Sequence, residues 1–232
     1  MKLLRPGLIP YGQALAWQLR LRARLQEGDP GPGYLLCLQH PPVITLGKRG
    51  HLEDLFGLEE LQRRGTQFYQ IDRGGEATYH GPGQLVLYPV VRLADLGIGV
   101  VDLIRTMAEA LAMALAEYGV EAAYDKEHPG LWTKTTPARK IASVGMRVSG
   151  GVSTHGAAIN LINDITPFSL FVPCGMPNAP ITRLADFYAE PVDVERFTDQ
   201  VLHHLARLLG LELCPYDEAP PEPDAWAPPL PV

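Results

Sequence analysis

The stretch RGGEATYHGPGQLVLYP, residues 73–89, combines two short β patterns with glycine-rich breakers. Residues 77–80 and 85–91 are predicted to form strands, and Gly81-Pro82-Gly83 separates them. Four glycines fall within residues 73–84, so the backbone there can approach a ligand closely and present amide donors to it. Taken alone, these glycines fit a purely structural turn equally well.

Helical periodicity lies on both sides of this β-rich centre. The spacing of apolar residues predicts helices over 11–26, 58–64, 100–118 and 194–209. Short apolar runs predict further strands over 34–39, 43–46, 68–72, 141–148 and 152–161. This order predicts a single α+β domain, residues 1–214, with a central mixed β-sheet flanked by helices. The Pro-rich residues 215–232 are expected to be an extended or disordered C-terminal tail.

Composition excludes several classes of protein. The chain of 232 residues is 46% hydrophobic and 20% charged, as in ordinary globular proteins, and no apolar run reaches the length of a membrane span. Its net charge of −6 argues against nucleic acid as a partner, and the N-terminus lacks a signal-peptide pattern. We therefore expect a cytoplasmic protein with no membrane partner.

The 3 cysteines do not form a disulfide framework or a Cys-x-x-Cys pattern, so we expect neither a metal site nor a cofactor. Cys37 lies within a buried apolar run and is best explained as a core residue. Cys174, between Pro173 and Gly175, lies in a constrained turn where a thiol can react. Cys214 beside the Pro-rich tail is a weaker candidate.

Two more segments place polar residues in glycine-rich or small-residue contexts. In residues 139–145, RKIASVG, Lys140 begins an apolar strand after a turn, where its ammonium can project into a cleft, although a lysine at a solvated strand end is the simpler explanation of the spacing. Residues 154–160, THGAAIN, leave space beside a strand of small residues for a slim apolar ligand. Close packing within a sheet would produce the same pattern.

Taken together, these segments resemble the octanoyl-carrier-protein:protein N-octanoyltransferases of lipoate biosynthesis, in the lipoate/biotin protein ligase superfamily. Residues 73–89 follow the family pattern R-G-G-x-x-T-Y-H-G-P-G-Q-x-V-x-Y-P without a break. The motifs HPPVITLGKRG at 40–50, GLW at 130–132, RKIASVG at 139–145, THGAAIN at 154–160 and PCGM at 173–176 recur in the family order. The resemblance implies a biotin/lipoate-ligase-like α+β fold and an acyltransferase activity.

The resemblance also implies roles for particular residues. The cysteine that carries the acyl thioester corresponds to Cys174, and the lysine that lowers its pKa corresponds to Lys140. The residues that bind substrate correspond to Arg73, Gly74, Gly75, Glu76, Ala77, Thr78, Tyr79, His80, Ser143, Val144, Gly145, Gly156, Ala157 and Ala158.

The implied donor is octanoyl-acyl carrier protein, and the implied acceptors are lipoyl domains of 2-oxoacid dehydrogenases and the glycine cleavage H protein. Because such carriers are typically acidic in this pathway, we expect Lys48, Arg49, Arg63 or Arg64 to contribute to docking.

Three alternatives stay open at the level of sequence. His80 or His155 could activate the thiol instead of Lys140, because a Cys-His pair is the commoner arrangement. An ATP-dependent lipoate or biotin ligase of the same fold would need no cysteine. A non-catalytic protein that binds acylated carriers would form no covalent adduct.

Overall fold

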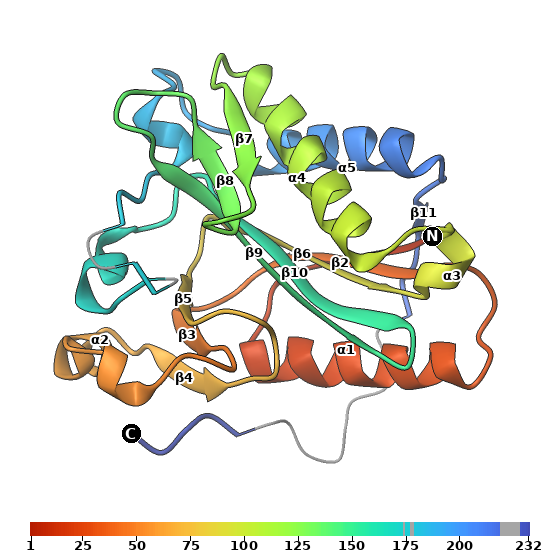
Figure 1. The fold of residues 1–232 in the computed structure, drawn as a ribbon, viewed down its shortest axis with the longest axis horizontal. Coiled ribbons are helices and arrows are strands. Elements are labelled where there is room, and N and C mark those ends of the chain that lie inside the picture. The colour runs from red at the N-terminus through yellow and green to blue at the C-terminus, as the bar shows by residue number, and fades with distance from the viewer. Residues whose placement is uncertain (174, 177–178, 219–227) are drawn as a thin grey trace.

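The computed structural model describes residues 1–232 except 174, 177–178 and 219–227, and Figure 1 shows its arrangement. The elements of the first half are β1 Lys2–Leu8, α1 Tyr11–Gln26, β2 Gly33–Gln39, β3 Val43–Leu46, α2 Leu58–Arg63, β4 Gln67–Gln70, β5 Ala77–His80 and β6 Gln84–Val91. Those of the second half are α3 Leu93–Leu96, α4 Val100–Ala116, β7 Ala122–Asp125, β8 Gly130–Thr133, β9 Lys140–Ser149, β10 Val152–Asn160, α5 Val194–Leu209 and β11 Cys214–Pro215. Short 3-10 turns cover Leu52–Asp54, Thr166–Leu170 and Leu184–Asp186.

The described strands form two sheets. The larger is 8-stranded with the order β11-β1-β2-β6-β10-β9-β8-β7, and it is mixed because β1 runs parallel to β2 and β11 while the pairs from β2 to β7 are antiparallel. The smaller is 3-stranded with the order β4-β3-β5. The predicted α+β class with a central mixed sheet flanked by helices is confirmed.

Helices cover both faces of the large sheet, with α1 on one side and α4 and α5 on the other (Figure 1). Successive residues of a strand point to opposite faces. In β2, Leu35 and Cys37 therefore pack with the core under α4 and α5, whereas Leu36 and Leu38 pack with the core under α1. A strand buried on both faces reads as the continuous apolar run that the sequence shows.

Four helices, α1, α2, α4 and α5, were predicted closely, whereas the short helix α3 was not predicted. Helices α1 and α5 have the predicted bounds, and Cys37 lies in the core as expected, where burial raises its pKa to about 12. Strands β1, β7, β8 and the two-residue β11 were not predicted. In β1, the Pro6-Gly7 pair looks like a breaker, but it falls at the irregular register between Leu4 and Gly7 where β1 still pairs with β2.

No helix in the described part of the chain is both long enough and apolar enough to cross a membrane.

Candidate active site

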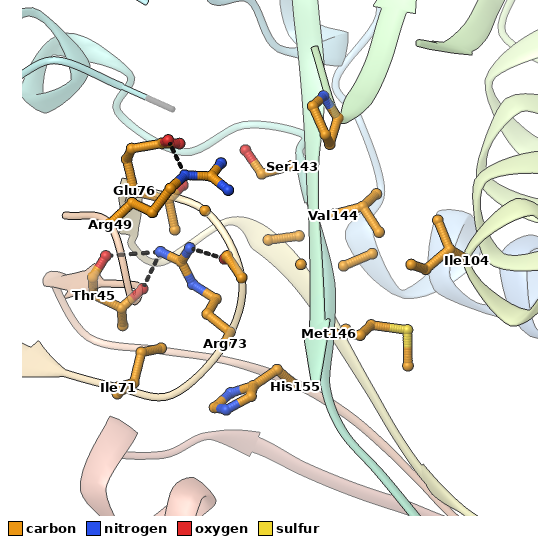
Figure 2. Close-up of a pocket in the computed structure, with 18 of the residues that line it drawn as sticks. Thr45, Arg49, Ile71, Arg73, Glu76, Ile104, Ser143, Val144, Met146 and His155 are labelled. Atoms are coloured by element: carbon orange, nitrogen blue, oxygen red, sulfur yellow. Dashed lines mark hydrogen bonds and ion pairs between the residues drawn. The ribbon is translucent and has the colours of Figure 1, made fainter. Parts of the chain in front are cut away.

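A cavity of about 590 Å³ lies between the glycine-rich turn before β5 and the two strands β9 and β10. Twelve of the predicted substrate-binding residues line it, namely Arg73, Gly74, Gly75, Glu76, Thr78, His80, Ser143, Val144, Gly145, Gly156, Ala157 and Ala158. Segments distant in the sequence are thus brought to one cavity, and Figure 2 shows Arg73 and Glu76 on one side of β9 and Val144 and Met146 on its other side.

The side chains of Ala77 and Tyr79 do not line the cavity. Because side chains alternate along β5, those of Thr78 and His80 line the cavity while those of Ala77 and Tyr79 enter a separate apolar cluster. There the Tyr79 ring meets Phe168 edge to face, with centroids 5.7 Å apart. A role for Ala77 and Tyr79 in binding substrate stays a prediction.

Backbone hydrogen bonds from the HPPVITLGKRG segment, residues 40–50, fix the glycine-rich turn in place. The N–H groups of Gly47, Lys48 and Arg49 donate to the carbonyls of Glu76, Arg73 and Gly75. No described residue accepts a hydrogen bond from the N–H of Gly74 or Gly75, so this turn can offer amide donors to an anionic group.

Two arginines contribute charge to the cavity. The Arg73 guanidinium is buried and donates to the Thr45 carbonyl at 2.8 Å, the Thr45 hydroxyl at 3.0 Å and the Gly74 carbonyl at 2.9 Å (Figure 2). Arg49 is exposed, and its Nε lies 2.7 Å from Glu76 Oε1. The first arginine fixes the turn against β3, and the second remains at the surface.

Lys140 is fully buried at the first position of β9. Its backbone N–H donates to the Pro180 carbonyl, and its carbonyl accepts from the Thr182 N–H. Through these two bonds Lys140 forms a parallel β-bridge with Ile181. Its Nζ donates to the Pro129 carbonyl at 2.8 Å and lies 5.9 Å from the centroid of the Trp132 ring. Because Pro129 lines the cavity, the ammonium lies directly behind the cavity wall.

Cys174 lies outside the described residues. On the two sides of it in the sequence, Pro173 forms an isolated bridge with Ala77, and Gly175 and Met176 line the cavity. The same stretch ends at Ile181, which bridges Lys140. Pro173 is therefore attached to the first residue of β5, and Ile181 is attached to Lys140.

A chain of buried side-chain amides fixes the protonation of His80. The Thr182 carbonyl can only accept, so Asn160 presents its Nδ2 to it and its Oδ1 to Gln84. Gln84 then donates through Nε2 to Asn160 and to the Tyr79 carbonyl, which leaves its Oε1 to accept from His80 Nδ1 at 2.8 Å. Burial lowers the pKa of His80 to about 3, so this ring is neutral near pH 7 with its proton on Nδ1.

His155 occupies a strained position in β10. Its φ of 58° is the left-handed conformation, which is uncommon outside glycine, and its N–H donates to Gln18 Oε1 at 2.7 Å. Its Nε2 lies 3.0 Å from Asp72 Oδ1. Burial lowers the pKa of His155 despite the opposing effect of Asp72, so this ring also favours the neutral form.

Several residues around the cavity were not predicted. Tyr11, Thr45, Tyr88, Pro129 and Ile104 line it. Only Thr45 and Tyr88 lie in quoted motifs, and the others come from the start of α1, the turn before β8 and the face of α4. No local sequence pattern marks such residues, because their position depends on how distant elements pack. Among the described residues, no group of three or more His, Cys, Asp or Glu side chains is arranged to hold a metal ion.

Comparison with known proteins gives consistent results. The family model of the lipoyl protein ligase A/B catalytic domain matches residues 10–206. A protein of Solibacter usitatus named octanoyltransferase is 38% identical over 210 residues, covering 90% of this chain and 93% of that protein.

Solved structures show the same fold at low identity. Lipoate-protein ligase A bound with ATP superposes with a TM-score of 0.76 at 20% identity, covering 94% of this chain and 90% of that one. Biotin protein ligase from Aquifex aeolicus gives a TM-score of 0.54 at 13% identity, covering 90% and 70%. The biotin/lipoate-ligase-like fold implied by the motifs is therefore confirmed.

Proposed function

Because the chain belongs to the family of lipoyl protein ligase A/B catalytic domains, we propose that it transfers an octanoyl group from acyl carrier protein to a lysine amine of lipoyl carrier domains. The chain is an acyltransferase. Its relatives named octanoyltransferase, 34–40% identical over most of the chain, carry that conclusion. The carrier donor, the lipoyl-domain acceptor and the route through Cys174 are the parts that we propose.

The proposed nucleophile is the thiolate of Cys174. A free thiol has a pKa of about 8.5 and is mostly protonated at neutral pH, so a neighbouring cation is needed to hold it as thiolate. We assign this role to the ammonium of Lys140, which is buried behind the cavity wall. A buried ammonium is itself stabilised by an anionic neighbour, so each charge favours the other.

The two histidines suit this role less well. A histidine lowers the pKa of a thiol as the imidazolium, but burial lowers the pKa of both His80 and His155 and so favours their neutral forms. This difference favours Lys140 as the residue that activates Cys174.

The first half of the reaction forms a thioester on the protein. The Cys174 thiolate attacks the thioester carbonyl of the donor, and the N–H groups of Gly74 and Gly75 are suited to stabilise the oxyanion. When the tetrahedral intermediate collapses, the bond to the carrier sulfur breaks and that sulfur takes a proton from Lys140. The products are octanoyl-Cys174, the free carrier thiol and a neutral Lys140.

The second half returns the enzyme to its starting state. A neutral lysine amine of the acceptor attacks octanoyl-Cys174, and Lys140 takes a proton from the attacking nitrogen. The carbon–sulfur bond then breaks, which gives an amide, the Cys174 thiolate and the Lys140 ammonium. Since a thioester is replaced by an amide, no ATP is consumed.

Intact-protein mass spectrometry after mixing with octanoyl carrier, without ATP, tests this proposal. We expect one octanoyl increment that maps to Cys174 and is lost in Cys174→Ser. A covalent octanoyl adduct on Cys174→Ser would contradict the assignment of the nucleophile. Release of pyrophosphate from octanoate and ATP, with no adduct, would instead identify a ligase.

A further inference from the structure

Strand β9 changes its neighbours along its length. On one side it pairs with β10 from Ala142 to Ser149. On the other side β8 accompanies it only as far as Ser143, which lies opposite Gly130. From Val144 to Val148, no strand of the described part of the chain covers this outer side of β9.

The register shows which backbone groups are uncovered. Gly150 and Gly151 both have positive φ, at 57° and 76°, as a two-residue type I′ hairpin turn requires. In such a hairpin Ser149 and Val152 form a hydrogen-bonded pair, and this pairing recurs at every second residue. The N–H and C=O groups of Gly145 and Arg147 therefore bond to β10.

The backbone groups of the alternate residues point outward. Val144, Met146 and Val148 each present one N–H and one C=O to the uncovered side, and no hydrogen bond among the described residues uses them. We call this row, Val144–Val148, the free edge of β9.

The free edge adjoins the active-site cavity. Val144 and Met146 line the cavity together with Ser143, and Figure 2 shows all three coming from β9. Lys140 lies four residues before Val144 on the same strand, which at a rise of about 3.3 Å per residue is roughly 13 Å. A chain lying along the free edge would reach the cavity at Val144, roughly 13 Å along β9 from Lys140.

The free edge also lacks the usual protection. Edge strands that bind no partner commonly carry a proline, a lysine or a β-bulge, because an unprotected edge can pair with a strand of another molecule. The sequence VGMRV over 144–148 has none of these. Its one charged residue, Arg147, is engaged in an ion pair with Asp72 at 2.7 Å.

We propose that the free edge of β9 binds an extended backbone segment of the acceptor protein, which adds a strand to the large sheet and directs its lysine into the cavity beside Val144. This inference rests on the proposed function, because it takes the acceptor to be a polypeptide. Alternating donors and acceptors along one line are complementary to another backbone. An acyl chain offers no donors and cannot satisfy them.

A second copy of this chain is the competing occupant, since two free edges could pair with each other. Amide hydrogen exchange followed by NMR on the whole protein distinguishes the two. The probe is an unmodified lipoyl domain of a 2-oxoacid dehydrogenase, added at saturating concentration with no acyl donor present, so that binding occurs without turnover.

We expect exchange at the amides of Val144, Met146 and Val148 to slow at least tenfold when the lipoyl domain is added. The amides of Gly145 and Arg147 serve as matched controls, because they already bond to β10 and should not change. Equal exchange at the three free-edge amides with and without the domain would overturn the proposal. So would protection that grows with the concentration of this protein alone, because it would identify a second copy as the occupant.

The outcome is separable from that of the mass-spectrometric test. If octanoyl-Cys174 forms but the three amides gain no protection, the docking proposal fails and the proposed function stands. If the amides gain protection but no adduct forms, the free edge binds the domain and the thioester route fails.

Discussion

Lys140 is the residue to which we assign the activation of Cys174. Its side chain is buried, and its Nζ donates to the Pro129 carbonyl at 2.8 Å, so the ammonium is held in one place behind the cavity wall. Burial of a charge is costly without a partner, whereas a solvated lysine at a strand end would need none. The solvated strand end considered for Lys140 is therefore wrong.

Removal of the Lys140 charge should make Cys174 behave as an ordinary thiol. We expect the rate of Cys174 alkylation in the wild-type protein to rise with an apparent pKa at least about one unit below 8.5, and Lys140→Met to restore the higher value. Alkylation measured against pH checks this, with His80→Ala and His155→Ala as controls. The base would be reassigned if a histidine variant, and not Lys140→Met, lost the low apparent pKa.

Two buried histidines should make the fold sensitive to acid. Burial lowers the pKa of His40 to about 4 and that of His80 to about 3, from about 6.5 in the unfolded chain. Below pH 6.5 the unfolded chain binds protons that the folded protein does not. Above this pH the two histidines do not lower the free energy of unfolding. As the pH drops from 6.5 toward the folded pKa values, the free energy of unfolding falls by about 1.4 kcal/mol per pH unit for each histidine.

Urea unfolding at pH 7, 6 and 5 checks this dependence. We expect the free energy of unfolding to fall with pH, and His40→Gln to remove about one histidine's share of the slope. His203→Asn is the matched control, because it removes an exposed histidine and leaves both buried histidines in place. An unaltered slope in His40→Gln would contradict the account.

At the scale of elements, the sequence predicts those helices and strands that are marked by the periodicity of their apolar residues or by the turn residues at their ends. The apolar alternation of residues 77–80 gives β5, and it also explains why Thr78 and His80, but not Tyr79, line the cavity. Strands β7 and β8 could not be predicted, because each has only 4 residues and is stabilised by pairing with its neighbours, β7 with β8 and β8 also with β9. Pairing between distant segments has no local signature.

The contact between β10 and β6 depends on Gly156. A Cβ at this position would lie 2.0 Å from the Leu87 carbonyl oxygen and 2.9 Å from Pro89 Cδ, and backbone atoms cannot move aside cheaply. We expect Gly156→Ala to destabilise the protein by about 1–3 kcal/mol or more, measured by urea unfolding.

Gly74→Ala is the matched control for that variant. A Cβ at Gly74 would meet nothing within 4 Å, so its effect on stability should stay within about 0.5 kcal/mol. Equal stability of Gly156→Ala and the wild type would show that β10 and β6 are not packed as described.

At the scale of the whole molecule, the motifs predicted which segments meet but not how. The resemblance brought residues 73–80, 143–145 and 156–158 together, and all three segments line one cavity. The basic pairs expected to dock carriers remain untested, although Arg63 and Arg64 both pair with Glu60, and Arg49 with Glu76. The pairs with Glu60 follow from i,i+3 and i,i+4 spacing on a predicted helix. The pairing of Arg49 with the distant Glu76 depends on three-dimensional packing and could not be read from the charge pattern.

The end of the chain contacts the small sheet. The Leu230 N–H donates to the Phe68 carbonyl of β4 at 2.7 Å, and the Leu230 side chain packs on the apolar cluster beneath that sheet. The division into a domain of residues 1–214 and a tail of 215–232 remains a prediction. A tail attached at Leu230 should nevertheless contribute to stability.

Truncation after Glu218 should lower the free energy of unfolding by about 1–2 kcal/mol, from one backbone hydrogen bond and one partly buried leucine. Urea unfolding of the truncated protein checks this. Leu230→Ala should lose only the apolar share of that energy. Identical unfolding of the truncated and full-length proteins would mean that the contact with β4 contributes nothing.

We propose that the octanoyl group passes through Cys174 on its way to a lysine. The most direct test is a chase: octanoyl-protein is isolated free of donor and mixed, without ATP, with an unmodified lipoyl domain, and both masses are followed over time. We predict that the octanoyl increment leaves this protein and appears on the lipoyl domain at least as fast as steady-state turnover. An increment that stays on this protein, or moves more slowly than turnover, would contradict the account.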